Sequence, residues 1–177
     1  MGDTSSRHCF ALLAHNEPGV LARLLGLLAG RGYNVESLTA DEIDHETNMS
    51  RITLVISGPP MVIDQVKAQL ERVIPVRCVE NLNKQGRHLE ICMALVKVVG
   101  DAAVHAEASR IVGEFNGRKL DQTASAVIYE FTAAADRIDA AVDKLRTLKA
   151  TIEVARAGSV GMACGEAVLG KQVTEAA

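Results

Sequence analysis

Hydrophobic and polar residues follow one another along the first half of the chain in a pattern that predicts strands and helices. Apolar side chains with a period of two indicate half-buried strands, and apolar side chains three or four positions apart indicate the buried face of a helix. These patterns predict strands at residues 9–14, 34–40, 51–56 and 76–82, and helices with the stripes Leu21, Leu24, Leu25, Leu28 and Val62, Val66, Leu70, Val73. The predicted order is strand, helix, strand, strand, helix, strand.

The same order returns in the second half of the chain. After polar residues 83–88, the patterns predict strands at residues 89–99, 119–123, 127–131 and 152–155, and helices at residues 102–116 and 138–148. A βαββαβ unit is the ferredoxin-like plan, an antiparallel sheet with both helices on one face. We therefore expect an α+β protein with two tandem ferredoxin-like domains, at residues 1–82 and 89–177, joined by a linker at residues 83–88. The second domain would include a C-terminal tail.

A short stretch of sequence recurs in the two halves. RLLGLLAGR, which begins at Arg23, aligns with RIVGEFNGR, which begins at Arg110, and both contain Arg, Gly, Gly and Arg at the same spacing. This match indicates an internal duplication. A glycine within a helix costs about 1 kcal/mol relative to alanine, so we expect Gly26 and Gly113 to let their helices lie close to the sheet or to a partner.

Each predicted sheet has one face without helices. Because the strands alternate and bulky aromatic residues are few, a single unit would expose apolar sheet to solvent. We expect that face to be covered by dimerisation or by packing between the two halves.

Composition and charge exclude several classes of function. The net charge is −3, from 19 basic and 22 acidic residues, and aromatic residues make up 3% of the chain. The sequence therefore offers neither a basic surface nor stacking side chains for nucleic acid. It also has no apolar run near the ~20 residues that a membrane-spanning helix needs and no signal-peptide pattern. We expect a cytoplasmic protein without a nucleic-acid or membrane partner.

The cysteines and acidic residues do not form a metal-binding pattern. Cys9, Cys78, Cys92 and Cys164 are scattered, and we expect reduced thiols that pack as small hydrophobic residues. A hairpin loop predicted at residues 41–46 contains enough carboxylates to hold a hard cation, but a solvated hairpin tip is the simpler interpretation. We expect neither a metal ion nor a cofactor in this chain.

The loop Asn16-Glu17-Pro18-Gly19 precedes the first helix and offers a site for a small anionic ligand. The first amide groups of a helix have no partner within it, and the positive end of the helix dipole favours a carboxylate. Gly19 permits close approach of the backbone, and the Asn16 amide can donate and accept for the charged groups of an amino acid. Asn34 opens the next strand, so its amide could lie near the same loop of a neighbouring subunit. Helix capping by Asn16 and an unusual backbone angle at Asn34 form the simpler alternative, which the spacing leaves open.

The second half lacks a counterpart of this loop. In the alignment of the two repeats, Ala103 stands opposite Asn16, and Ala106 stands opposite Gly19. The repeat retains the scaffold without the polar loop, and we expect the second domain to contact another protein.

An enzymatic reading of the fold finds little support in the sequence. Acylphosphatases share this plan, but they hold phosphate with an Arg between the first strand and the first helix. Here that loop has Glu17 and Pro18, and Arg23 lies a full turn further on. The histidines also have no nearby nucleophile pattern. We expect no catalytic residues.

The segment NEPGVLARLLGLLAGRGYNVESL, residues 16–38, resembles the ACT domain of the acetolactate synthase small-subunit family. The resemblance extends through residues 50–53, 93–97 and 152–158, and it covers about residues 8–170. It implies a non-catalytic regulatory partner of a thiamine-diphosphate enzyme that makes acetolactate on the way to valine, leucine and isoleucine. Such a partner activates the catalytic subunit and confers feedback inhibition by valine.

The resemblance also implies a site and an assembly. Valine would bind between paired ACT domains, at Asn16, Gly19 and Asn34, with backbone groups of Val20, Leu21 and Val35 beside it. The assembly would be a homodimer bound to the large catalytic subunit, with thiamine diphosphate, Mg and FAD only on that subunit. The alternative is an ACT-type sensor of another amino acid that acts on a different enzyme.

The sequence departs from the family pattern at three positions. Ile91 and Cys92 stand where family members carry Arg and Glu, and Cys164 stands where they carry a basic residue. All three lie outside the implied valine site, so they bear on contact with the catalytic subunit and not on the ligand.

Overall fold

The computed structural model describes residues 6–170, which form two compact units. The first unit combines residues 6–90 with residues 159–170, and the second unit is Ile91–Gly158. The parts of the predicted domains at residues 1–5 and 171–177 lie outside the described residues.

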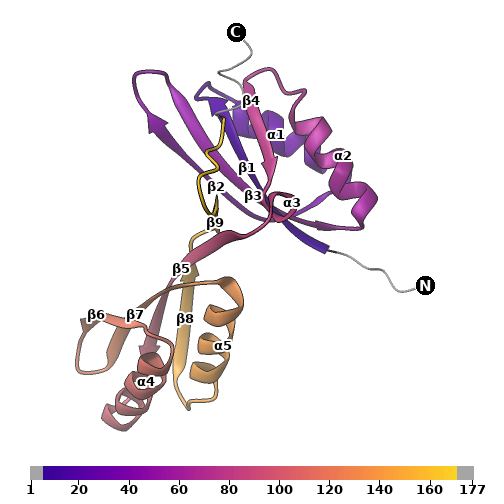
Figure 1. The fold of residues 1–177 in the computed structure, drawn as a ribbon. Helices are drawn as coiled ribbons and strands as arrows, with labels where there is room; N and C mark the ends of the chain where they lie inside the picture. Colours follow the sequence, from indigo (N-terminus) through magenta and orange to yellow (C-terminus); the bar gives the residue numbers. More distant parts are fainter. Residues whose placement is uncertain (1–5, 171–177) are drawn as a thin grey trace. The chain divides into compact units, whose positions relative to one another are not determined.

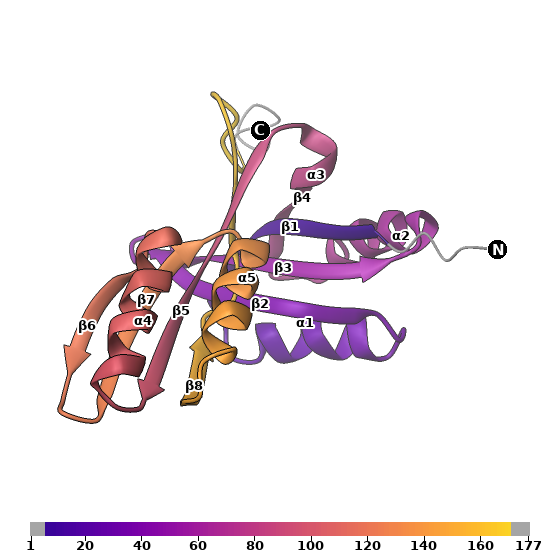
Figure 2. The ribbon, with the colours of Figure 1, turned by 90° about the horizontal axis from the view of Figure 1, so that it is seen from below.

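The first unit is an antiparallel sheet with two long helices on one face (Figure 1). Its elements are β1 Ser6–His15, α1 Val20–Ala29, β2 Asn34–Asp44, β3 Met49–Gly58, α2 Pro60–Leu70, β4 Val76–Asn81, the short helix α3 Leu82–Gln85, and β9 Val160–Ala163. The strand order is β2-β3-β1-β4. Figure 2 shows α1 alongside β2. Phe10, Leu12, Leu24 and Ile52 are fully buried between the sheet and the helices, which is the arrangement that their spacing predicts.

The second unit repeats this plan. Its elements are β5 His88–Val99, α4 Ala102–Glu114, β6 Arg118–Gln122, β7 Ala126–Ala133, α5 Ala135–Arg146 and β8 Thr151–Arg156. The strand order is β6-β7-β5-β8, and β5, which crosses the boundary between the units, also pairs with β9. Tyr129, Phe131 and Leu145 lie in its core. Both sheets place their strands in the same ferredoxin-like order, which confirms the predicted α+β fold class.

The predicted hairpin loop at residues 41–46 is wrong. β2 continues to Asp44, because Asp41 and Glu42 pair in register with Arg51 and Ser50 of β3. The turn occupies residues 45–48. The Asp44 carboxylate accepts hydrogen bonds from the backbone N–H of Glu46 at 2.9 Å and of Thr47 at 3.3 Å, which lowers its pKa, with the Thr47 side chain as the largest cause.

The structure also differs from the predicted linker at residues 83–88. These residues contain most of α3, which belongs to the first unit. The Asn81 side chain caps this short helix by accepting a hydrogen bond from the Asn83 N–H. The Asn83 side-chain oxygen accepts a hydrogen bond from the Cys9 N–H at 2.8 Å, and Leu82 is buried against the sheet. Local polarity suggested a linker, whereas capping and one buried leucine give a docked turn of helix.

Residues 159–170 return to the first unit, so their predicted place in the second domain is wrong. Together with Leu82, this segment covers the sheet face opposite α1 and α2, where Cys9, Ala11 and Val55 are completely buried. Ala163 and Leu169 pack against this cluster. The chain itself therefore provides cover that we expected from dimerisation or from packing between the halves.

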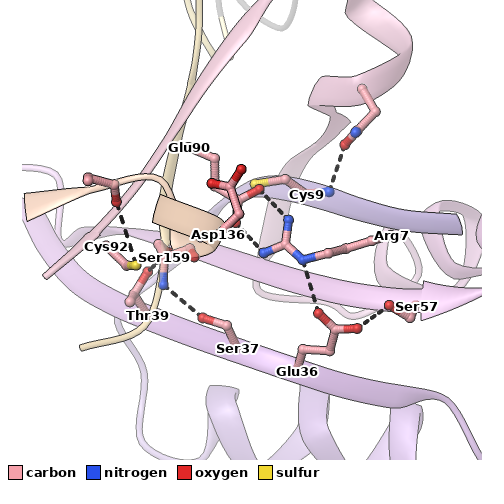
Figure 3. Close-up of polar contacts among 12 residues, drawn as sticks. Arg7, Cys9, Glu36, Ser37, Thr39, Ser57, Glu90, Cys92, Asp136 and Ser159 are labelled. Carbon is pink, nitrogen blue, oxygen red and sulfur yellow. Dashed lines mark hydrogen bonds and ion pairs between the residues drawn. The ribbon is translucent and has the colours of Figure 1, made fainter. Parts of the chain in front are cut away.

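Side chains of β2 and β3 fix the returning segment by hydrogen bonds. The Ser37 hydroxyl accepts a bond from the Ser159 N–H at 2.8 Å, and the Thr39 hydroxyl donates to the Ser159 carbonyl at 2.9 Å (Figure 3). Arg51 Nη2 donates to the Gly161 carbonyl at 2.7 Å. These bonds satisfy backbone groups of the segment that would otherwise be buried without partners.

Arg7 joins β1 to β2 and to the start of β5. Its guanidinium makes a bidentate ion pair with Glu90, in which both Nη1, at 2.7 Å, and Nη2 donate. Its Nε donates to the Glu36 carboxylate at 3.0 Å (Figure 3). Only 15% of the Glu90 side chain is exposed. The hydrogen bonds from Arg7 are the largest cause that holds the pKa of Glu90 below its usual value.

Glu90→Gln is expected to lower the stability of the first unit near neutral pH by about 1–3 kcal/mol, because it weakens a charge-assisted pair of which one member is largely buried. Since the pKa of Glu90 is lower in the folded state, its contribution is present above the unfolded pKa and is lost as the pH falls below about 4.5. Urea unfolding between pH 7 and pH 3 should therefore show a smaller difference between variant and native protein in acid. The control is Asp64→Asn, which removes the exposed pair with Lys84 and is expected to change little. Equal losses in both variants at every pH would contradict the assignment.

The glycines within α1 and α4 do not serve close packing on the sheet. A Cβ atom built at Gly26 or Gly113 would meet no heavy atom within 4 Å. The expectation that these glycines let the helices lie close to their own sheet is therefore wrong. An approach to a partner at these positions stays a prediction.

Candidate functional site

The start of α1 presents free backbone donors. Gly19 is the N-cap residue, its φ of 81° lies in the left-handed region that favours glycine, and no side chain caps the helix. The Val20 N–H bonds to the Glu17 carbonyl at 3.2 Å, and the Arg23 N–H bonds to the Gly19 carbonyl at 2.9 Å. Within residues 6–170, the amides of Leu21 and Ala22 have no acceptor. Two N–H groups at the positive end of a helix thus remain available to an anion.

Leu21, one of these two donors, lines a cavity of about 290 Å³ in the first unit. Its lining consists of Asn16, Val20, Leu21, Ala40, Asp41, Glu42, Ser50 and Ile52. Three of the residues predicted from the sequence, Asn16, Val20 and Leu21, are therefore brought together at one cavity. The wall that they face comes from the end of β2 and the start of β3.

Asn16 does not cap α1, so the capping alternative is wrong for this residue. Its side-chain Nδ2 donates to the Glu42 carboxylate at 3.2 Å, and its backbone N–H donates to the Asn48 carbonyl at 2.8 Å. The Asn48 side chain in turn donates to the Asn16 carbonyl at 3.1 Å. Both backbone groups of Asn16 are thus satisfied by the turn between β2 and β3, which directs its amide toward the cavity lining.

Asn34 and Val35 lie at the other end of β2 and do not line this cavity. Asn34 pairs in register with Ser57, whereas Glu42 pairs with Ser50. Glu42 lies eight positions along the extended strand from Asn34, which is roughly 25 Å at about 3.3 Å per residue. A ligand of amino-acid size cannot touch Asn16 and Asn34 of the same chain. Asn34 is exposed, so a second copy of the chain can reach it.

The corresponding helix start in the second unit is closed. α4 begins at Ala102, and its N-cap residue Asp101 accepts a hydrogen bond from the Val104 N–H at 2.9 Å. A carboxylate of the chain thus occupies the position that a ligand carboxylate would take. Ala103 and Ala106 lie within α4 and not in a loop, because this helix starts earlier relative to the aligned glycines than α1 does.

Sequence reasoning did not place Ala40, Glu42, Ser50 and Ile52 at the site. The signal that could have found them is the period of two along β2, which puts Ala40 and Glu42 on one face once the strand is extended to Asp44. The sequence pattern instead places Glu42 in a predicted hairpin loop at residues 41–46. The register with β3 then adds Ser50 and Ile52.

A larger cavity, of about 810 Å³, lies in the first unit between β4 and residues 162–170. Its lining contains three basic and three acidic side chains, and Lys67 pairs with Glu80 at 3.3 Å and with Glu71 at 3.8 Å. Neither α1 nor α2 begins at this cavity, and none of the predicted site residues lines it. The cavity beside α1 is therefore the better candidate for a small anionic ligand.

None of the four cysteines, all of which lie within residues 6–170, forms a disulfide, and Cys9 and Cys92 are buried. Burial raises the pKa of the Cys9 thiol to about 11 and also raises the pKa of Cys78, which disfavours the reactive thiolate. Within residues 6–170, no group of three His, Cys, Asp or Glu side chains is arranged to hold a metal ion. No helix in the same range is long and apolar enough to cross a membrane.

Comparisons with known proteins match both units to the same protein family. The family described as AHAS small subunit-like ACT domain matches residues 10–77, and the family described as small subunit of acetolactate synthase matches residues 92–165. The isozyme 3 small subunits of acetolactate synthase from Salmonella typhimurium and Escherichia coli are each 34% identical over 163 residues, which cover 92% of this chain and 99% of each relative. The crystal structure of the acetolactate synthase small subunit from Thermotoga maritima is 29% identical, has a TM-score of 0.81, and is matched over 92% of this chain and 99% of that one.

The ferredoxin-like fold and the open helix start after the first strand define the class as an ACT-domain protein with a second ferredoxin-like unit. The relatives define the family more narrowly. The chain belongs to the acetolactate synthase small-subunit family.

Proposed function

We propose that this chain is a non-catalytic regulatory subunit of acetolactate synthase, which activates the large catalytic subunit and confers feedback inhibition by valine. The observation that carries the proposal is the uncapped start of α1 beside a cavity of about 290 Å³, in a member of the small-subunit family. Thiamine diphosphate, Mg and FAD belong to the catalytic subunit in this proposal. The chain itself acts by binding and not by catalysis.

The cavity has the chemistry that valine requires. The free amides of Leu21 and Ala22 receive its carboxylate at the positive end of the helix dipole. Apolar atoms of Val20, Leu21 and Ile52 receive its branched side chain, whose burial is favourable by roughly 25 cal/mol per Å². Gly19 leaves the approach to these amides free of a Cβ atom.

Two copies of the chain complete the site in this proposal. Since Asn34 and Val35 lie far from Asn16 within one chain, a homodimer supplies them from the second copy. Valine would then hold two first units in one arrangement and shift the population that the catalytic subunit encounters. Coupling of this kind is typically ~1–3 kcal/mol.

The departures from the family pattern bear on the contact with the catalytic subunit. Ile91 is 37% exposed, so it can take part in that contact as an apolar residue in place of an Arg. Cys92 faces the core of the second unit, and its Sγ lies 3.6 Å from the Ala133 carbonyl. The exchange of Glu for Cys92 thus changes the packing of the unit more than its surface.

Asn16→Ala and Asn34→Ala are each expected to weaken valine binding about tenfold or more in calorimetry, since each removes about one polar contact to the ligand, worth roughly 1–2 kcal/mol. Mixing the two variants and allowing their subunits to exchange is expected to restore one unmodified site in each mixed dimer. That result follows only if Asn16 and Asn34 of one site come from different chains. Each variant incubated alone under the same conditions is the control, and both should still coelute with the catalytic subunit.

Several outcomes would count against the proposal. Restoration would fail if both residues of a site belonged to one chain. If the native chain bound no valine but gave clear heat with serine or phenylalanine, the result would favour the alternative, an ACT-type sensor of another amino acid. Failure to copurify with a thiamine-diphosphate enzyme would overturn the assigned partner.

A further inference from the structure

The cavity beside α1 has an acidic lining. Its eight lining residues include Asp41 and Glu42 but no Lys, Arg or His. A ligand that carries only a carboxylate would meet donors at the helix start and a negative charge opposite them. A ligand that also carries a cation is better matched to such a lining.

Of the two acids, Glu42 stands on the face that holds the cavity. Side chains alternate along β2, so Glu42 shares a face with Ala40, and its register partner Ser50 shares a face with Ile52. Asp41 points to the other face of the strand, opposite Arg51 in register. Glu42 is therefore the carboxylate that a ligand in the cavity can reach.

The Glu42 side chain is held in place but retains acceptor capacity. Asn16 Nδ2 donates to its Oε2 at 3.2 Å, and His45 Nδ1 lies 2.9 Å from its Oε1. Only 27% of the side chain is exposed, whereas 89% of His45 is exposed. An ionised carboxylate has about four acceptor positions, so two contacts leave room for an ammonium group. A partly desolvated carboxylate is also where an ion pair gains most from a lower local dielectric.

We propose that Glu42 binds the α-ammonium group of the ligand and thereby selects amino acids against 2-oxo acids and 2-hydroxy acids of the same carbon skeleton. This inference rests on the proposed function, because it takes an amino acid as the ligand of this cavity. The amides of Leu21 and Ala22 hold the ligand carboxylate, and Glu42 holds the ammonium group from the opposite wall. Besides its own contact with the ligand, Asn16 fixes the orientation of the Glu42 carboxylate through its amide Nδ2.

The opposite charges of the two cavity walls, donors at the helix start and a carboxylate at Glu42, explain the selectivity. An acid without the amine would offer Glu42 no ammonium partner and would place a second negative charge close to it. A charge-assisted hydrogen bond contributes about 1.5–3 kcal/mol, which corresponds to roughly a 10- to 150-fold difference in affinity. Removing the charge of Glu42 should abolish most of this preference.

The test is calorimetric titration of the full-length chain with valine and with 3-methyl-2-oxobutanoate, its 2-oxo acid, for native protein and for Glu42→Gln. Native protein should bind valine at least tenfold more tightly than the oxo acid. Glu42→Gln should lose roughly 10- to 100-fold in valine affinity and should bind the oxo acid as well as native protein does, or better. Glu42→Asp, which keeps the charge, should retain part of the preference for valine. Glu46→Gln is the matched control, because it removes the same charge from the neighbouring turn, outside the cavity lining, and should leave both affinities unchanged.

Three results would overturn the inference. If Glu42→Gln bound valine as tightly as native protein, Glu42 would not meet the ammonium group. If Glu42→Gln lost affinity for both ligands equally while its thermal unfolding stayed native-like, Glu42 would shape the cavity without recognising the amine. If native protein bound neither ligand, the proposed function would fail and the inference with it, whereas the first two results would leave valine binding by native protein intact.

Discussion

Replacing Gly19 with aspartate is expected to weaken valine binding by roughly 100-fold or more, equivalent to at least about 2.7 kcal/mol. An aspartate at an N-cap position accepts hydrogen bonds from the amides two and three residues further on, which here are Leu21 and Ala22. The variant would thus fill the proposed carboxylate site with a carboxylate of its own. The start of α4, where Asp101 accepts from the Val104 N–H, already shows this closed state within the same protein.

Gly19→Ala distinguishes the effect of an added carboxylate from the effect of backbone strain. Gly19 has a φ of 81°, so alanine at this position is strained by roughly 1–2 kcal/mol but adds no acceptor. We expect a smaller loss of valine affinity for alanine than for aspartate, although aspartate tolerates the left-handed region better. Calorimetry on both variants, with thermal unfolding to check that each is folded, measures the difference. Equal losses would show that backbone strain and not the added carboxylate is responsible, and native affinity in Gly19→Asp would exclude the start of α1 as the carboxylate site.

Gly161→Ala is expected to destabilise the first unit by about 1–3 kcal/mol, the usual range for an overpacked core. A Cβ atom at Gly161 would lie 2.5 Å from the Cys9 Sγ and 2.8 Å from the Leu82 Cδ1, and both residues are buried. Cys9 is completely buried against the sheet, so the returning segment is expected to shift away from it. Cys9 should then react faster with a thiol reagent, which mass spectrometry of its peptide can follow.

The matched control for this substitution is Gly113→Ala. Gly113 lies within α4, where an added Cβ meets no heavy atom within 4 Å. The same chemical change is therefore expected to stabilise the protein by up to about 1 kcal/mol through helix propensity. Urea unfolding of both variants compares the two effects. Stabilisation by alanine at Gly161 would mean that residues 159–170 do not pack against the sheet as described.

Much of the fold could be predicted because it is encoded locally. The alternation of Ile52, Leu54 and Ile56 and the helical spacing of Leu21, Leu24 and Leu28 are properties of neighbouring residues, and they predict the type and order of the elements. The pairing order of the strands followed because few topologies connect such a sequence of elements. The place of Gly19 at the helix start also followed from local sequence, since it directly precedes an apolar helical stripe, whereas its left-handed φ came from the structure.

Prediction from the sequence is weaker wherever a residue acts through a distant partner. Glu42 resembled a loop residue, and only its register with Ser50 places it on the wall of the cavity. Ser159 bonds to Ser37, 122 positions earlier in the chain, and no local pattern announces such a contact. The predicted linker failed for the same reason, since the Asn83 side chain accepts a bond from β1 and the Asn83 N–H donates to Asn81 of β4.

The sequence by itself determined the two ferredoxin-like units, the open loop at the start of the first helix and, through resemblance, the family. The tertiary structure decided which chain segment covers the second face of the first sheet, which acid faces the cavity, and that Asn16 and Asn34 of one chain lie at opposite ends of β2. The physical reason is that hydrophobic period and helix capping depend on residues a few positions apart. Strand register and the return of residues 159–170 depend on contacts whose free energy appears only when distant segments meet.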